Sequence, residues 1–451
     1  MTKIEFPKDF LWGAGTSSYQ IEGAWNRDGK GLSIWDTFTH AQGNIKNNDT
    51  GDIACDHYYR FKDDVQLMKE LGLTTYRFSI SWPRIFPKGD FELNKEGITF
   101  YDRLVDELLR NGIEPMITLY HWDMPQDLMN RGGLLTRDFI PVFEAYADYL
   151  FDYFGNRVKK WVTFNEPWVF TFRSYKNGFF PPRIKGMQNG IDSTHITNLA
   201  HASAVRKFRE KKIKNGVIGT AQCAFHFEPE ENTASCVEKA RYADLYQNRW
   251  YWDPALRGEY PQEMVEYFEK VHKSALKMEP GDRELLKDGI SDFFGANYYF
   301  RLMVRDNGPD KPFIEEECVY MGAGSPHTEI GWEVNPQALY TMLMRVKKDY
   351  NTDIYITENG IACKDDVVNQ GVIQDDDRIA YISSHLKEIH RAINDGAKVK
   401  GYYAWSLMDN FEWTHGFTKK FGLVKTDYKT QKRTVKKSGY FYKDVIKNNG
   451  F

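Results

Sequence analysis

The chain has 451 residues, a length that allows two or three domains, although α/β barrels of this size often form only one. Its 60 basic and 63 acidic side chains leave a net charge of −3, which excludes the strong positive field that binds nucleic acid or an anionic membrane surface. Aromatic residues make up 15% of the chain, and such an excess suits a site that stacks against flat apolar faces.

Short β-branched or aromatic runs alternate with amphipathic helical stretches along the whole chain. In chain order, the predicted strands are 10–14, 75–80, 114–120, 161–164, 217–220, 293–297, 354–357 and 401–405. Apolar residues at helical spacing predict helices near 98–108, 137–154 and 379–393, and Gly112 and Gly396 follow the first and the last of them.

Eight alternating strand and helix units predict an α/β protein, with one (β/α)₈ barrel domain over residues 1–451 and enlarged loops after its strands. A doubly wound parallel sheet is the alternative. It is weakened because no Gly-x-Gly-x-x-Gly sequence follows any predicted strand.

The cysteines indicate the compartment. There are five, an odd number, and none of them has the tight spacing of a metal ligand pair: Cys55, Cys223, Cys236, Cys318 and Cys363. We expect reduced, unpaired thiols in a reducing compartment, and therefore a cytoplasmic protein. The first ten residues lack the apolar core of a signal peptide, and no apolar run approaches the length of about 18 residues that a membrane span needs.

In a barrel, the chemistry lies at the carboxyl ends of the strands. Seven of the eight predicted strands end in polar or aromatic candidates, and only the fifth offers no clear one. These candidates are Gln20, Arg77, His121, Trp122, Asn165, Glu166, Asn297, Tyr298, Tyr299, Glu358 and Trp405.

Two glutamates stand out among these candidates. Glu166 ends the run 162–166 and is followed by Pro167, while Glu358 ends the run 354–358 and is followed by Asn359. A carboxylate at the end of a buried strand is costly unless it has a function. A pair of them could divide the roles of acid and nucleophile. The alternative is that either glutamate forms an ordinary salt bridge at the barrel mouth.

The sequence resembles glycoside hydrolase family 1, the β-glucosidase family. The resemblance runs nearly from end to end, and its motifs lie in the family's order on the expected strands. They are found at 10–13, 18–23, 76–82, 119–123, 163–167, 297–299, 356–360 and 405–413. Each motif alone is only modestly specific, and the whole ordered set makes the resemblance strong.

The resemblance implies a retaining β-glycosidase that forms a covalent glycosyl-enzyme intermediate. By the family pattern, Glu166 is the general acid/base and Glu358 is the nucleophile. Retaining enzymes hold these carboxyl groups about 5–5.5 Å apart. An ionised Glu358 would then raise the pKa of Glu166, which stays protonated and ready to protonate the leaving oxygen.

The same resemblance suggests roles for further residues. Arg77 and Tyr299 would orient Glu358 and keep it ionised, Asn297 would support the nucleophile side, and Asn165 would hold the sugar 2-hydroxyl. The other implied substrate contacts are Gln20, His121, Trp122, Trp405, Glu412 and Trp413, with Trp168 and Trp332 on the leaving-group side. The segment 179–183 departs from the family pattern just after the acid/base strand, so the aglycone is left open.

One branch of the family cleaves 6-phosphorylated sugars and has a small residue where this chain has Glu412. That branch also uses a lysine and a tyrosine nearby to hold the phosphate. Here Lys419 is present, but Phe421 stands at the tyrosine position. A carboxylate at Glu412 would repel a phosphate dianion, so we expect an unphosphorylated glycone, glucose first, with galactose and fucose tolerated.

The sequence disfavours two other classes of function. A non-catalytic sugar binder on this fold would usually lose one of the two carboxylates, and this chain keeps both. A metal-dependent barrel hydrolase would need histidine ligands, but the 11 histidines include no His-x-His pair at a strand end. We therefore expect no metal and no cofactor, and a small carbohydrate as the binding partner. The oligomeric state is open, and a homo-oligomer is kept as one alternative.

Overall fold

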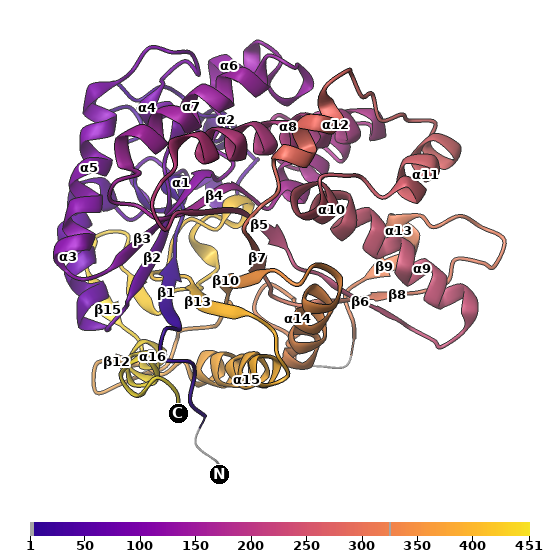
Figure 1. Cartoon of the computed structure of the whole chain (residues 1–451). Coiled ribbons are helices and arrows are strands. Elements are labelled where there is room, and N and C mark those ends of the chain that lie inside the picture. Colours follow the sequence, from indigo (N-terminus) through magenta and orange to yellow (C-terminus); the bar gives the residue numbers. More distant parts are fainter. Residues whose placement is uncertain (1–3, 324–325) are drawn as a thin grey trace.

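Eight parallel strands close into a barrel at the centre of the computed structural model, which describes residues 4–323 and 326–451 (Figure 1). The barrel strands are β1 (Leu11–Gly15), β2 (Thr75–Ser79), β3 (Glu114–Tyr120), β4 (Lys160–Asn165), β5 (Val217–Cys223), β7 (Phe293–Asn297), β10 (Asp353–Asn359) and β13 (Val399–Trp405). They follow one another around the barrel in chain order, and β13 closes it by pairing with β1 from Leu11↔Gly401 to Gly15↔Trp405.

The predicted barrel is confirmed, and the sequence shows why these segments form it. All five residues of β2 are buried, which is the pattern of a parallel strand covered on both faces. Inside the barrel, small residues lie next to large side chains and leave space for them. A side chain on Gly13 would come within 2.7 Å of the ring of Tyr403 and the methyl group of Thr75. Both β5 and β10 continue beyond their predicted ends, to Cys223 and Asn359.

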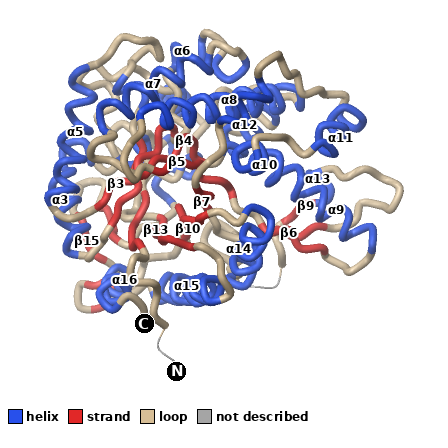
Figure 2. The backbone as a smooth tube through the Cα atoms, viewed as in Figure 1, coloured by secondary structure: helices blue, strands red, loops and turns tan. Residues whose placement is uncertain are grey.

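Helices surround the strands, as the blue ring around the red strands in Figure 2 shows. The main outer helices are α3 (His57–Glu70), α5 (Lys95–Arg110), α7 (Phe139–Phe154), α8 (Met187–Lys211), α10 (Trp250–Arg257), α12 (Asp282–Asp288), α14 (Pro336–Tyr350), α15 (Asp376–Asn394) and α16 (Lys437–Asn448). The three helices predicted from periodicity are α5, α7 and α15. Helix α5 buries Ile98, Tyr101, Val105 and Leu108 against the barrel, as their spacing predicted.

The enlarged loops carry extra structure that the sequence did not predict. Strands β6 (His226–Pro229), β8 (Arg301–Val304) and β9 (Val319–Tyr320) form a small sheet beside the barrel. It lies with α9 (Ala234–Asp244), α11 (Gln262–His272) and α13 (Glu315–Cys318) at the right of Figure 1. Two hairpins pair β11 (Val368–Asn369) with β12 (Val372–Ile373), and β14 (Val424–Thr426) with β15 (Arg433–Val435).

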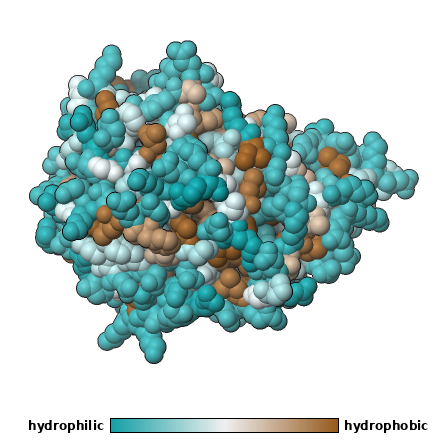
Figure 3. Space-filling view, turned by 90° about the horizontal axis from the view of Figure 1, so that it is seen from above, coloured by the Kyte–Doolittle hydropathy of each residue, from teal (hydrophilic) through white to brown (hydrophobic). Residues whose placement is uncertain are grey.

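Short helices complete the loops: α1 (Ser18–Ile21), α2 (Ile34–His40), α4 (Trp82–Ile85), α6 (Gln126–Asn130), η1 (Lys46–Asn48), η2 (Gly133–Leu135), η3 (Val169–Lys176), η4 (Leu245–Arg249) and η5 (Trp413–Thr418). Seen from above, the surface is largely hydrophilic, with hydrophobic residues in scattered patches (Figure 3). Within residues 4–323 and 326–451, no helix combines the length and apolar character that crossing a membrane requires.

The two ends of the described chain meet at the foot of Figure 1, near α16. The backbone N–H of Ile4 donates to the carbonyl oxygen of Phe451 at 2.9 Å, and that of Phe451 donates to Ile4 at 3.0 Å. Residues 4 and 451 therefore pair like neighbouring strands, at the end of the barrel opposite the carboxyl ends of its strands.

Candidate active site

The two predicted catalytic glutamates stand where the barrel ladder is irregular. The pairing of β4 with β5 shifts between Val162 and Asn165, and Glu166 follows with a left-handed backbone at φ 51°. The pairing of β10 with β7 shifts between Ile356 and Glu358. Register shifts of this kind redirect side chains that would otherwise alternate in and out of the barrel.

Strong donors bind both oxygens of the Glu358 carboxylate. The Arg77 guanidinium donates to Oε1 at 2.7 Å and the Tyr299 hydroxyl donates to Oε2 at 2.7 Å. Burial raises the pKa of Glu358, while the charge of Arg77 and the hydrogen bond from Tyr299 oppose that rise. Because hydrogen bonds to the charged form favour it, Glu358 is the carboxyl of the pair that ionises first.

Glu166 has no such charged partner. Its Oε1 accepts a hydrogen bond from the Asn297 amide at 3.1 Å, and the Cys223 thiol also bonds to the carboxyl group. Burial and, second, the charge of Glu358 raise the pKa of Glu166 to about 8. The sequence had suggested the second cause, and the structure adds burial as the larger one. Glu166 therefore keeps its proton at neutral pH.

Asn165 links the groups around the two glutamates. Its Oδ1 accepts from Arg77 Nη2 at 2.6 Å and from Asn297 Nδ2 at 3.0 Å. Asn297 also hydrogen-bonds Glu358. Asn297, expected on the nucleophile side, thus contacts both carboxyl groups.

This arrangement fixes the tautomer of His121. Arginine can only donate, so the Asn165 atom facing it is the oxygen, and the Asn165 amide nitrogen faces His121 Nε2 at 3.0 Å. Nε2 must then accept, which leaves the proton on Nδ1. Burial and the charge of Arg77 hold the pKa of His121 well below its usual value, so the ring is neutral. Nδ1 is buried without a hydrogen-bond partner among the described residues.

Aromatic rings form one wall of the site. The His121 ring stacks on Trp405 and Trp413, with centroids 5.9 and 6.0 Å apart and planes inclined by 17° and 19°. Trp122 packs on Trp413 at 4.3 Å and donates its Nε1–H to the backbone oxygen of Asn165 at 2.9 Å. Four predicted substrate contacts are thus brought together in one cluster.

Gln20 and Glu412 differ in how they are held. The Gln20 amide donates to Asn410 Oδ1 at 3.1 Å and to the Phe411 carbonyl oxygen at 2.8 Å, so it anchors the loop that carries Glu412. The Glu412 carboxyl has no hydrogen bond within the described part of the chain. Burial and the charges of Glu358 and Glu166 raise the pKa of Glu412 to about 8.

Trp168 and Trp332, predicted on the leaving-group side, lie at two ends of one aromatic row. Trp168 contacts Phe225 at 5.4 Å, Phe225 contacts Phe300 at 5.8 Å, and Phe300 contacts Trp332 at 5.0 Å. Trp332 also packs on Tyr299 at 5.1 Å, which connects the row to the tyrosine that donates to Glu358.

Cys223 is the residue that sequence reasoning missed. It ends β5, the strand that offered no candidate, and its thiol bonds to Glu166. Burial and the two glutamates raise the pKa of Cys223 well above its usual value, so the thiol stays protonated and able to donate. The available signal was the continued alternation of small and polar residues through 221–223, beyond the predicted end of the strand at Thr220.

A buried and a partly buried carboxyl group with unlike partners, at the mouth of a (β/α)₈ barrel lined by aromatic and amide side chains, define a site of the glycoside hydrolase class. The family model of glycosyl hydrolase family 1 matches residues 2–451, and the chain belongs to this family of retaining O-glycoside hydrolases.

Relatives match over their whole length. The chain is 43% identical to β-glucosidase A of Acetivibrio thermocellus, covering all of both chains. It is similar to the structure of the family 1 β-glucosidase from Thermotoga maritima, with a TM-score of 0.94, 42% identity and full coverage of both chains. A relative with a different named activity, the aryl-phospho-β-D-glucosidase of Bacillus subtilis, is 41% identical over 99% of this chain and 98% of its own.

Proposed function

We propose that the protein is a β-glucosidase that removes terminal, non-reducing β-D-glucosyl residues from small glucosides such as cellobiose. The observation that carries this proposal is the unequal surroundings of the two glutamates. Glu358 receives hydrogen bonds from Arg77 and Tyr299, whereas Glu166 receives them only from neutral donors. One carboxyl group is thereby suited to attack as an anion and the other to donate a proton.

In the first step, the Glu358 carboxylate attacks the anomeric carbon while Glu166 gives its proton to the glycosidic oxygen. The bond to the leaving group breaks, and the sugar is left esterified to Glu358. The amide of Asn165, held by Arg77 and Asn297, is oriented to bind the 2-hydroxyl, a contact that strengthens in the transition state.

In the second step, esterification has removed the charge of Glu358, so the pKa of Glu166 falls. Glu166 then takes a proton from a water molecule, whose oxygen attacks the anomeric carbon and releases Glu358. The two inversions together retain the configuration of the sugar.

An unphosphorylated glycone is supported by Lys419 and Phe421. Lys419 corresponds to the lysine that holds the phosphate in the phosphosugar branch, but here its ammonium donates to the backbone oxygen of Glu329. Phe421 packs on Tyr299 and Trp332 at 6.1 and 5.9 Å and has no hydroxyl group to offer a phosphate. Glu412 stands at the position that distinguishes the phosphosugar branch. Its pKa of about 8 leaves it mostly protonated at neutral pH, and its ionised form would repel a phosphate dianion.

The role of each glutamate is tested by azide rescue. Glu358→Ala should lose turnover of dinitrophenyl β-glucoside, and added azide should restore it and give the α-glucosyl azide, because azide enters the space of the missing nucleophile. Glu166→Ala is the matched variant and should give the β-azide. A β-azide from the Glu358 variant would show that the two roles are exchanged.

The glycone is tested with nitrophenyl β-glucoside and its 6-phosphate at equal concentration. We expect the plain glucoside to react faster by more than about tenfold, with the β-galactoside and β-fucoside also accepted. A preference for the phosphate would leave the fold and the two glutamates in place and move the protein to the phosphosugar branch.

We further infer that residues 1–451 act as one catalytic domain in the cytoplasm. The five cysteines are buried and unpaired, which suits a reducing compartment.

A further inference from the structure

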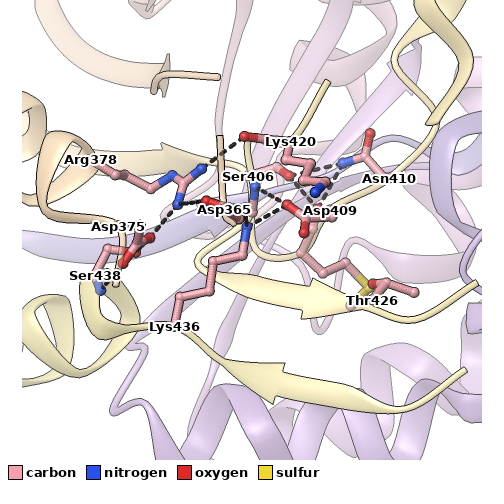
Figure 4. A network of polar contacts seen from close by, with 12 residues as sticks. Asp365, Asp375, Arg378, Ser406, Asp409, Asn410, Lys420, Thr426, Lys436 and Ser438 are labelled. Carbon is pink, nitrogen blue, oxygen red and sulfur yellow. Dashed lines mark hydrogen bonds and ion pairs between the residues drawn. The ribbon is translucent and has the colours of Figure 1, made fainter. Parts of the chain in front are cut away.

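A buried group of charges outside the set of residues that would touch the sugar includes Asp409, on the loop that carries Glu412. Figure 4 shows its members and the contacts between them. We call it the Lys436 network. It consists of three acids and two bases, each at most 5% exposed: Asp365, Asp375, Arg378, Asp409 and Lys436.

Lys436 joins two carboxylates. Its ammonium contacts Asp409 Oδ1 at 2.6 Å and also binds Asp365 Oδ2. Arg378 extends the network from Asp365 to Asp375 and donates to the backbone oxygen of Lys420 at 2.8 Å.

These contacts connect the two loops on which the site depends. Asp365 lies on the segment that leaves β10 after Glu358, and Asp409 lies on the loop between Trp405 and Glu412. Lys436, just before α16, contacts both of these aspartates. The nucleophile's loop and the glycone loop, residues 406–413, are therefore tied to one ammonium group.

Backbone hydrogen bonds spread this anchoring along the glycone loop. Asp409 Oδ1 also accepts from the Gly422 N–H at 2.9 Å, and the Asp409 N–H donates to Val424 at 2.9 Å. At the other end of the loop, Gln20 holds Asn410 and Phe411. Glu412 and Trp413 follow directly, so their position is set by what holds Asp409 to Phe411.

A contribution to stability does not explain why the Lys436 network consists of buried charges. Desolvating ions costs several kcal/mol each, and apolar replacements of buried ion pairs are often neutral or stabilising. Here Asp409 Oδ2 has no partner among the described residues, which adds to the cost. Unlike an apolar contact, however, an ammonium between two carboxylates fixes direction and distance.

We propose that Lys436 and Asp409 are positioning residues: their ion pair sets where Glu412 and Trp413 stand relative to Glu358, and so determines how the sugar's 6-position is recognised. This inference rests on the proposed β-glucosidase function. Neither residue touches the reacting atoms, and both act through the loop.

The test compares hydrolysis of nitrophenyl β-glucoside with that of its 6-deoxy analogue. This analogue lacks the hydroxyl group at the 6-position, the position at which Glu412 distinguishes this chain from the phosphosugar branch. In Lys436→Met we expect kcat/KM on the glucoside to fall about tenfold to a hundredfold, mainly through KM, as for a small displacement of a binding group. The 6-deoxy substrate should lose less than about threefold, because it never used that contact.

A second variant guards against a folding failure. Asp409→Asn keeps the shape of the side chain and an oxygen for the Gly422 N–H, but weakens the bond to Lys436, so it should shift the same ratio in the same direction. Lys437→Met is the matched control: this neighbouring lysine forms an exposed ion pair with Asp376, and its removal should change neither rate.

The ratio of the two rates separates positioning from stability, because a smaller folded fraction lowers both rates equally. An unchanged ratio in both Lys436→Met and Asp409→Asn would overturn the inference while the proposed function stands. If the unaltered enzyme hydrolyses neither substrate, the proposed function fails and the positioning role fails with it.

Discussion

At Glu166, burial, the charge of Glu358 and two neutral donors act on a single proton. Burial and the charge of Glu358 raise the pKa, while the hydrogen bond from Asn297, the charge of Arg77 and the hydrogen bond from Cys223 lower it, and the balance is a pKa of about 8. Glu358 has the same functional group, but Arg77 and Tyr299 donate to it and favour its charged form. The neighbours, which come from other strands, make the two glutamates different.

The pH dependence of catalysis should follow from this balance. Glu166 must be protonated to act as the acid, so kcat/KM should fall as pH rises through about 8, the pKa of this carboxyl group. Cys223→Ala removes a donor that favours the ionised form. It should therefore raise the pKa and move the basic limb of the pH–rate profile upward by roughly half a unit to one unit.

Cys223→Ser is the control, since a hydroxyl group can still donate to Glu166, and its basic limb should stay near that of the unaltered enzyme. A basic limb that moves to lower pH in Cys223→Ala would contradict the role given to the thiol.

Sequence motifs located most of the site at this scale. The family pattern named both glutamates together with Arg77 and Tyr299. In the structure Arg77 and Tyr299 both donate to Glu358, and Glu166 is linked to Arg77 through Asn297 and Asn165. The sequence did not reveal Cys223, because the predicted strand stopped before it. Nor did the family pattern show that Asn297 contacts both carboxyl groups. Asn297 ends β7, whereas Glu166 follows β4 and Glu358 lies in β10, and contacts between residues so distant in the chain cannot be read from a local motif.

At the scale of elements, helix α15 carries a buried histidine on the face that packs against the barrel. His385 stacks on Tyr381 with centroids 3.8 Å apart, and its Nδ1–H donates to the Tyr381 carbonyl oxygen at 2.8 Å. Its Nε2 has no partner among the described residues. Burial lowers the pKa of His385 to about 4, so the folded protein keeps this ring neutral.

His385 should make the fold sensitive to acid. The unfolded chain protonates it near its ordinary pKa of about 6.5, so stability is full above that pH and is lost as pH falls toward 4. This amounts to about 2 kcal/mol at pH 5. In His385→Phe, the fall in Tm between pH 7 and pH 5 should be smaller by a few degrees.

The partly exposed His390 on the same helix offers the comparison, and His390→Asn should leave the fall in Tm unchanged. A residual fall is expected in every variant, because burial also lowers the pKa of His201 to about 4. If His385→Phe showed the full fall, the acid sensitivity would belong to other groups.

The periodicity of apolar residues predicted the long helices and the barrel strands, and it missed the short strands inside the loops. Long apolar faces such as that of α5, and the runs buried on both sides in the barrel, have a clear period. The sheet of β6, β8 and β9 consists of strands of two to four residues inside long loops. Such strands are too short for a period, and their partners are distant in sequence.

For the whole molecule, the state of the five thiols can be measured directly. All five are buried and unpaired. An aromatic disulfide reagent should react with almost none of them in the native protein and with all five after denaturation, and reductant should leave Tm unchanged. Fewer than five reactive thiols in denaturant would reveal a disulfide and weaken the case for a reducing compartment.

The pairing of Ile4 with Phe451 has a consequence for the covalent chain. Because these residues are within hydrogen-bonding distance, a short linker could join them and make the backbone a ring. New ends could then be opened in the turn between β11 and β12, where Gly371 has open space around it. In such a circular permutant the order of the eight barrel strands in the chain would change, while their order around the barrel, and the mouth that they build, would stay the same.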